Sequence, residues 1–189
     1  MLDENENISS NQGLLKSSIV KRAVVCLMVI AAVFLGFYTS LIFSADKLTA
    51  EERAQVDESI RILEERGFQD EAFLLKHLAA FRANDNWLNA SVAKENAYAA
   101  TNFPFEIVTL YPDFFTYPVD ATERAAILLH EAKHLQGKDE KDAYEYVWRN
   151  RKRLGWKFEA YRTSAIWMEN AKAYQGTCSR SFRVRLQPV

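Results

Sequence analysis

The sequence has few cysteines, few histidines and almost no net charge, and each shortage excludes a class of protein. Its 189 residues include two cysteines and three histidines, and the formal net charge is −1. Cys26 lies inside a hydrophobic run, which leaves Cys178 alone in the rest of the chain, so we expect no disulfide framework. A net charge near zero provides no basic field for a nucleic acid, and we expect no nucleic-acid partner.

One long hydrophobic run is present near the N-terminus. Residues 23–43 read AVVCLMVIAAVFLGFYTSLIF, which is close to the ~20 residues that span a bilayer. The run is longer than the ~7–15 residues of a signal-peptide core, and cleavage after Ala45 would place the large Phe43 where a small residue is required. The run therefore predicts a transmembrane signal-anchor over residues 23–45. A cleaved signal peptide is the alternative.

Charges beside the run predict its orientation. Lys16, Lys21 and Arg22 precede it, and positive charge favours the cytoplasmic side of a membrane. We thus expect residues 1–22 to form a cytoplasmic tail and residues 46–189 to form one extracytoplasmic domain. The single cysteine of that domain suits a bacterial inner membrane, with the domain facing the periplasm.

The remaining chain predicts an α+β domain that is mostly helical and contains a short β-sheet. Thr49 and Glu52 have the spacing of a capping box, and Asp120 or Thr122 can cap a later helix. Residues 1–15, in contrast, are polar and without periodicity, and predict a disordered segment. Apolar periodicity predicts helices over residues 50–66, 70–83, 91–99, 121–136, 139–153 and 156–174, and strands over residues 105–111 and 181–186.

The feature that carries chemistry is the segment HEAKH at residues 130–134, an H-E-x-x-H motif. Residues four apart share one face of a helix, so His130 and His134 can bind one metal ion while Glu131 acts on a water at that ion. The motif therefore predicts a Zn²⁺ site with His130 and His134 as ligands and Glu131 as the catalytic base.

A third ligand is expected because catalytic zinc usually takes three protein ligands. Beyond the motif the sequence continues as H-E-x-x-H-x-x-G-x-x-E, with Gly137 followed by Glu140. Glu140 has a suitable ligand type and spacing. Asp142 and Glu145 are the nearby alternatives, and Glu145 lies about 140° around a helix from Glu140, so both cannot reach one ion. His77 is the remaining histidine, and we expect it on a partly buried face of its own helix, together with Phe73, Leu74, Leu78 and Phe81.

These residues resemble the zincin metallopeptidases. The set His130, His134 and Glu140 is similar to the gluzincin pattern, although its short spacing is closer to that of the metzincins, in which a histidine stands at the position of Glu140. The resemblance implies a small zincin-like domain in which zinc activates a water that hydrolyses a peptide bond. Glu131 would transfer the proton of that water to the leaving amine.

The resemblance also indicates where a peptide or protein substrate would bind. In zincins the substrate pairs with the edge of a strand near the motif helix, which suggests this role for residues 105–111. The alternative is a strand that serves only for packing. Tyr144, Tyr161 or Tyr174 would donate a hydrogen bond to the oxyanion, and Asp142 or another carboxylate would orient a histidine.

We therefore expect a membrane-anchored zinc-dependent metallopeptidase. The alternative is a non-catalytic anchored zincin-like domain that binds a partner protein, and a third possibility is a helical interaction protein with incidental histidines. Zinc content separates the third from the other two. Loss of hydrolysis with retained zinc in the Glu131→Gln variant separates an enzyme from a binding domain.

Overall fold

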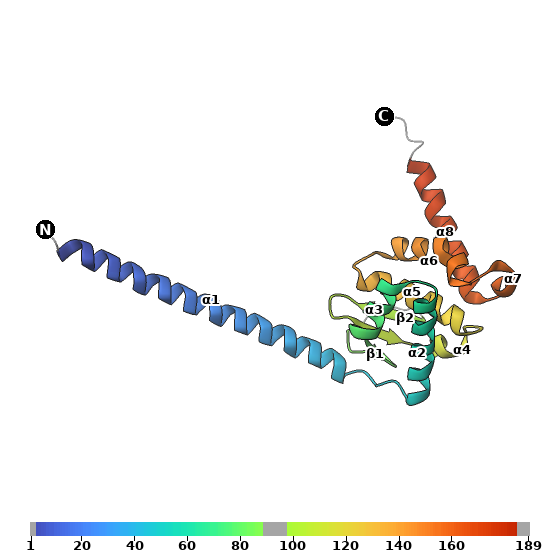
Figure 1. Cartoon of the computed structure of the whole chain (residues 1–189), viewed down its shortest axis with the longest axis horizontal. Coiled ribbons are helices and arrows are strands. Elements are labelled where there is room, and N and C mark those ends of the chain that lie inside the picture. Colours follow the sequence, from blue (N-terminus) through green and yellow to red (C-terminus); the bar gives the residue numbers. More distant parts are fainter. Residues whose placement is uncertain (1–2, 89–97, 185–189) are drawn as a thin grey trace. The chain divides into compact units, whose positions relative to one another are not determined.

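A computed structural model describes the backbone of residues 3–88 and 98–184, and the side chains of residues 19–88 and 98–176. The chain divides into two units, Met1–Leu41 and Ile42–Val189. Figure 1 colours the chain from its N-terminal helix in blue to its C-terminal helix in red.

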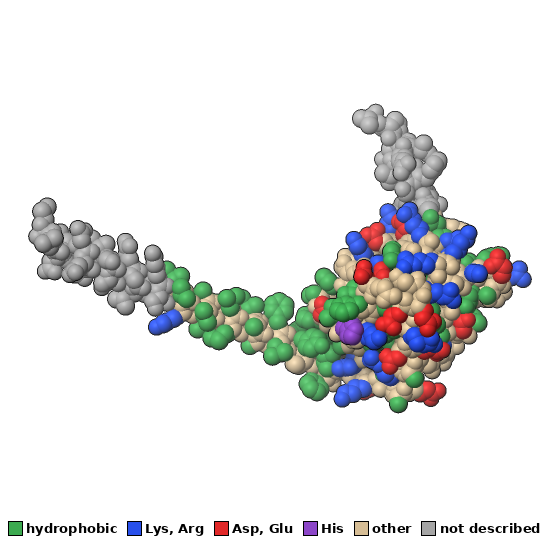
Figure 2. Space-filling view, viewed as in Figure 1, with side chains coloured by type: hydrophobic (Ala, Val, Ile, Leu, Met, Phe, Trp, Pro, Cys, Tyr) green, Lys and Arg blue, Asp and Glu red, His purple; other side chains and the backbone are tan. Residues whose placement is uncertain are grey.

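One continuous helix, α1 (Asp3–Phe43), accounts for the first unit. Its segment Ile19–Phe43 has a mean hydropathy of 2.4 and is long and apolar enough to cross a membrane. Figure 2 shows hydrophobic side chains along the described part of this helix and intermixed acidic and basic side chains on the second unit. The prediction of a disordered segment over residues 1–15 is wrong from Asp3 onward, because a helix nucleated by the apolar run extends through neighbouring residues that lack proline.

The second unit is mostly helical and contains one small sheet, which confirms the predicted α+β class. Its elements are α2 (Ala50–Glu65), α3 (Gln69–His77), β1 (Ala80–Arg82), β2 (Ala99–Asn102), β3 (Ile107–Leu110), α4 (Pro112–Thr116), α5 (Ala121–Leu135), α6 (Glu140–Leu154), α7 (Phe158–Tyr161) and α8 (Ala165–Val184).

The three strands of the sheet have the order β1-β3-β2. β1 runs parallel to β3, with Phe81 opposite Val108, and β2 runs antiparallel to β3, with Thr101 opposite Val108. The predicted strand at residues 105–111 is confirmed over Ile107–Leu110, where all four residues are buried. Its predicted role in substrate binding is wrong, because a central strand has no free edge.

Helix α5 lies at the centre of the domain and contacts α2, α3, α6 and β2. Its apolar residues Ala125, Leu128, Leu129 and Ala132 are fully buried, so the helix that carries the motif is held by the core. Asp120 is its N-cap and accepts hydrogen bonds from the backbone of Thr122 and Glu123. Of the two predicted caps, Asp120 and Thr122, the helix therefore uses Asp120.

Other helix boundaries also follow the sequence. The capping box of Thr49 and Glu52 is present at the start of α2. α6 begins after its N-cap Asp139 and buries the face formed by Ala143, Val147 and Leu154.

The burial of α3 differs from the prediction. Its buried apolar residues are Ala72 and Leu75, whereas Phe73 is 56% exposed, and Phe81 belongs to β1. His77 is exposed, with its ring 4.8 Å from that of Phe73. The helix ends earlier than predicted because the chain turns into the sheet at Ala80, where its backbone N–H donates to Glu106.

The C-terminal elements also differ. The predicted helix over residues 156–174 is divided at Ser164, whose hydroxyl donates to Glu123 and accepts from the backbone of Trp167, so α8 starts anew. The predicted strand over residues 181–186 is helical up to Val184, because α8 continues through it. The predicted helix over residues 91–99 lies mostly outside the described residues.

Candidate metal site

The two histidines of the motif lie one turn apart on α5, and their rings face each other. The His130 Nε2 and His134 Nε2 atoms are 3.1 Å apart, and the ring planes meet edge to face. Both side chains are largely buried, with exposed fractions of 12% and 17%. The predicted placement on one helix face is therefore confirmed.

Glu140 completes the cluster from the first position of α6. The connection between the helices is short because Gly137 adopts a positive φ of 72° at the end of α5, which glycine tolerates best, and Asp139 caps α6 two residues later. The Glu140 carboxylate lies 3.1 Å from His130 Nε2 through Oε2 and 3.4 Å from His134 Nε2 through Oε1. The structure thus brings together all three residues proposed as ligands.

These separations match the geometry of a tetrahedral zinc site. Zinc bonds of about 2.0–2.1 Å in a tetrahedron place neighbouring ligand atoms about 3.3 Å apart. Here one ligand atom from each of His130, His134 and Glu140 lies within 4.8 Å of the others, and the closest pairs are separated by 3.1–3.4 Å. A small shift of side chains would place one ion at bonding distance from all three.

The orientation of His134 is fixed by the backbone. Its Nδ1 lies 2.9 Å from the carbonyl oxygen of Lys138, which can only accept a hydrogen bond. Nδ1 therefore donates to this carbonyl, and Nε2 is the nitrogen that faces the cluster, where it could bind a metal ion once its own proton is released. For His134, this acceptor is a backbone carbonyl in the turn after α5 and not Asp142, whose side chain is exposed.

Charge inside the cluster couples the titration of its members. Burial lowers the pKa of His134, but the hydrogen bond to Glu140, the charge of Glu131 and the bond to Lys138 outweigh burial and raise this pKa to about 9. Hydrogen bonds from His130 and His134 hold the pKa of Glu140 well below its usual range. A divalent cation would replace the proton that the cluster retains in the absence of metal.

Glu131 faces a different partner from the histidines. Its side chain accepts a hydrogen bond of 2.7 Å from the hydroxyl of Thr101 on β2, and the residue is only 5% exposed. The sequence does not predict Thr101, because it comes from a segment 30 residues away that meets α5 only when the sheet forms.

The alternative ligands lie elsewhere. Glu145 pairs with Arg149, one turn further along α6. Asp142 is exposed, and His77 lies exposed on α3 beside Phe73.

Of the three tyrosines considered, one lies at the cluster. The Tyr144 ring packs edge to face on His130, with 4.5 Å between ring centroids, and burial with the charge of Glu140 raises its pKa to about 12. Tyr161 donates to Asp120, and Tyr174 stacks on Trp148. A phenol that keeps its proton can donate a hydrogen bond, so Tyr144 is the suitable donor at this site.

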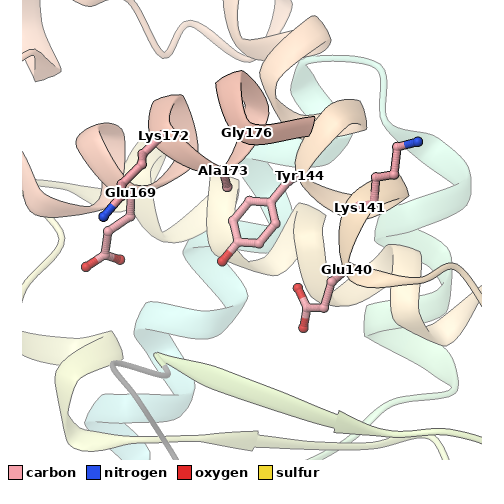
Figure 3. A pocket seen from close by; sticks show the side chains of 7 residues that line it. All are labelled: Glu140, Lys141, Tyr144, Glu169, Lys172, Ala173 and Gly176. Carbon is pink, nitrogen blue, oxygen red and sulfur yellow. The ribbon is translucent and has the colours of Figure 1, made fainter. Parts of the chain in front are cut away.

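A cavity of about 300 Å³ opens beside the cluster and is lined by His130, Glu131, Glu140 and Tyr144 among others. A second cavity of about 500 Å³ shares Glu140 and Tyr144 with it. Figure 3 shows the lining of this second cavity, with the Tyr144 ring between Glu140 and Glu169.

The arrangement can hold one divalent cation and leave room for a water and a substrate group beside Glu131. Comparison of the chain with family models, with curated proteins and with solved structures finds no match. The geometry of these side chains is therefore the basis for a function.

Proposed function

We propose that this protein is a membrane-anchored, zinc-dependent metallopeptidase. The observation that carries the proposal is the cluster of His130 Nε2, His134 Nε2 and the Glu140 carboxylate. The two nitrogens are 3.1 Å apart, and the two carboxylate oxygens lie 3.1 Å from His130 and 3.4 Å from His134. Two imidazoles and one carboxylate, with the fourth position open to a cavity, form the ligand set typical of a catalytic zinc ion. A structural zinc site would instead be closed by four protein ligands.

The residues around the site have distinct roles in hydrolysis. Bound zinc supplies Lewis acidity toward a water and a scissile carbonyl. Glu131, oriented by Thr101, takes a proton from that water and delivers it to the leaving amine. Tyr144, whose pKa is about 12, keeps its proton at neutral pH and donates a hydrogen bond to the developing oxyanion.

The substrate chain would pair with β2 rather than with β3. Among the described strands β2 lies at the edge of the sheet, and it contacts α5 and carries Thr101, which donates to Glu131. An extended peptide added to such an edge gains main-chain hydrogen bonds, and its scissile bond would lie along the motif helix.

The long apolar segment of α1 supports membrane attachment. Lysines 16 and 21 and Arg22 flank the segment on its N-terminal side, which favours a cytoplasmic N-terminus and an extracytoplasmic catalytic domain. A bacterial inner membrane with the domain in the periplasm fits this arrangement.

Zinc content of the purified full chain in detergent tests the site. We expect about one zinc per chain by elemental mass spectrometry, and a loss of at least tenfold in zinc affinity in His134→Ala and Glu140→Ala, since each removes one of three ligands. Glu145→Ala is the matched control, because it removes a carboxylate of α6 that pairs with Arg149 instead. Absence of zinc from folded, zinc-supplemented protein would contradict the proposal.

Hydrolysis of peptide pools tests the reaction. The Glu131→Gln variant should retain zinc and lose activity by a factor of about 10²–10⁴, the usual contribution of a general base. Retained zinc without hydrolysis in the wild-type protein would instead support the non-catalytic domain that binds a partner protein.

A further inference from the structure

The cavity beside the cluster has a wall that hydrolysis does not use. Helix α8 forms this wall with Ile166, Glu169 and Asn170, opposite His130 and Glu131 on α5. The α8 side is therefore placed to contact the substrate rather than the metal.

The carboxylates of the cavity differ in their partners. Glu140 is held by the two histidines, and Glu131 accepts a hydrogen bond from Thr101. Glu169 accepts a hydrogen bond from the neutral phenol of Tyr98, and within the described residues no Lys or Arg forms an ion pair with it. Among the residues that the structure describes, Glu169 is thus the carboxylate of this cavity that neither pairs with a Lys or Arg nor belongs to the metal cluster.

Glu169 brings a carboxylate to the α8 side of this cavity, apart from the metal cluster. A half-buried carboxylate in a cavity attracts a group of opposite sign more strongly than the same group would in water.

The shape and the remaining lining suit an alkyl chain that ends in a cation. Ala126, Ile127 and Ile166 provide apolar surface along the cavity. The methylene stem of a lysine or arginine packs well on apolar surface while its charged end reaches a polar partner.

We propose that this cavity receives a positively charged group of the substrate and that Glu169 is the residue that selects it. The group is a lysine or arginine side chain, or a free amino terminus, since all three carry the same kind of charge. This inference rests on the proposed function of the site.

The neighbouring cavity is also lined by Glu140 and Glu169, but it contains lysines as well. Lys141 and Lys172 line that cavity and not the one at the histidines. In Figure 3 the Lys141 side chain points away from Glu140 and Tyr144. A cationic group is therefore favoured more on the histidine side of Tyr144, where no lysine is among the lining residues described, than on the other side.

Binding to a catalytically inactive form tests selectivity apart from hydrolysis. The zinc-loaded full chain carrying Glu131→Gln is titrated with fluorescent peptide pools in which one position is fixed as Lys, Arg, norleucine or Glu, each with a free or an acetylated amino terminus. We expect the Lys and Arg pools, or the pools with a free amino terminus, to bind at least tenfold more tightly than acetylated norleucine pools. Comparison of the pools with fixed Lys or Arg and the pools with a free amino terminus identifies whether a side chain or the amino terminus supplies the charge.

Variants assign the selectivity to Glu169. Adding Glu169→Gln, which keeps the size and an acceptor for Tyr98, should remove the tenfold preference, and Lys172→Gln should strengthen it. Glu159→Gln removes the same charge at an exposed position of α7 and should leave the preference for cationic pools unchanged. A preference for cationic pools that survives Glu169→Gln, or no preference in protein with zinc bound, would overturn the inference. Failure of wild-type hydrolysis would count against the proposed function and not against this selectivity.

Discussion

A buried ion pair links the motif helix α5 to α3. Lys133, a variable position of the motif, extends from α5 to Glu71 on α3, with 2.5 Å between Nζ and Oε1, and both side chains are less than a tenth exposed. Tyr146 donates to the same carboxylate and its ring lies under the ammonium. Although burial raises the pKa of Glu71, the hydrogen bonds from Lys133 and Tyr146 lower this pKa overall, so the Glu71 carboxylate stays ionised.

Removing one member of this pair should destabilise the domain. Glu71→Ala leaves the ammonium of Lys133 buried without its counter-charge, and we expect a loss of about 3–5 kcal/mol in the free energy of unfolding. Urea denaturation in detergent measures this loss. Glu58→Ala, on the exposed face of α2, should change the same quantity by less than about 0.5 kcal/mol. A loss of similar size in both variants would contradict the role of the pair.

The contact between His134 and Glu140 predicts that the stability of the metal-free protein depends on pH. The pKa of His134 rises from 6.5 to about 9 on folding, so its contribution to stability is complete below pH 6.5 and is lost as pH rises through about 9. The pKa of Glu140 is depressed, so its contribution is present above its ordinary value and is lost as pH falls below that value. The free energy of unfolding in EDTA should therefore be highest between about pH 4.5 and pH 6.5, the ordinary pKa values of the two groups. It should decrease by about 1–2 kcal/mol toward pH 9.5, after allowance for the exposed carboxylate of Glu140.

Thermal unfolding in EDTA across this pH range checks the prediction. His134→Gln should reduce the loss of stability on the alkaline side. His77→Gln, which changes an exposed histidine of α3, should keep the wild-type pH profile. An alkaline decrease that persists in His134→Gln would assign it to another group.

At the residue scale, the sequence predicts local geometry and misses contacts between distant segments. His130, His134 and Glu140 fall within eleven consecutive positions, and helical spacing with one glycine turn is sufficient to bring them together. Thr101 and Glu71 reach the motif helix from 30 and 62 residues away. No periodicity in either segment indicates those contacts, since they depend on how the sheet and α3 pack.

A side chain of α6 binds the backbone at the end of α2. Arg153, in the last turn of α6, donates from Nε to the carbonyl of Arg66 and from Nη2 to that of Gly67, just after α2. Gly67 has a φ of +82°, and a Cβ built there would lie 2.7 Å from Arg153 Nη2. The glycine is therefore required both by its backbone conformation and by the close approach of the guanidinium.

Gly67→Ala should lower the free energy of unfolding by about 1–2 kcal/mol, because it adds a strained positive φ and displaces Arg153. Chemical denaturation of the full chain measures the change. Gly176→Ala is the control, since it lies within α8 with open space around its Cβ, and it should be neutral or stabilising by up to about 1 kcal/mol. Equal effects of the two substitutions would argue against the contact.

At the element scale, end signals predict boundaries better than periodicity predicts burial. Thr49 and Asp139 mark helix starts because their side chains satisfy backbone N–H groups locally. The predicted buried face of α3 is wrong. Phe73 has the sequence pattern of a core residue, but its side chain is 56% exposed. The alternation around Phe182 fits a strand, yet α8 extends through it because a helix already formed adds residues at little cost.

At the scale of the whole chain, α1 should retain the protein in a membrane. Ile30 and Val33 lie near the middle of the apolar segment, and each lysine placed at such a depth costs about 2.5–3.5 kcal/mol of insertion free energy. The variant Ile30→Lys/Val33→Lys should therefore leave the membrane fraction on alkaline extraction, while wild type stays. Ile30→Leu/Val33→Ile should behave as wild type, and extraction of the wild-type chain would contradict the anchor.

The long-range contacts of the domain have a consequence for its synthesis. Glu71 and Lys133 are 62 residues apart, and Gly67 and Arg153 are 86 apart, so at a synthesis rate of roughly 5–20 residues per second several seconds separate the partners. Until α5 has been made the core lacks its central helix, and until α6 has been made the end of α2 lacks its contact with Arg153. We therefore expect the nascent domain to remain unfolded through this interval, which is the state in which a polypeptide can be threaded across a membrane.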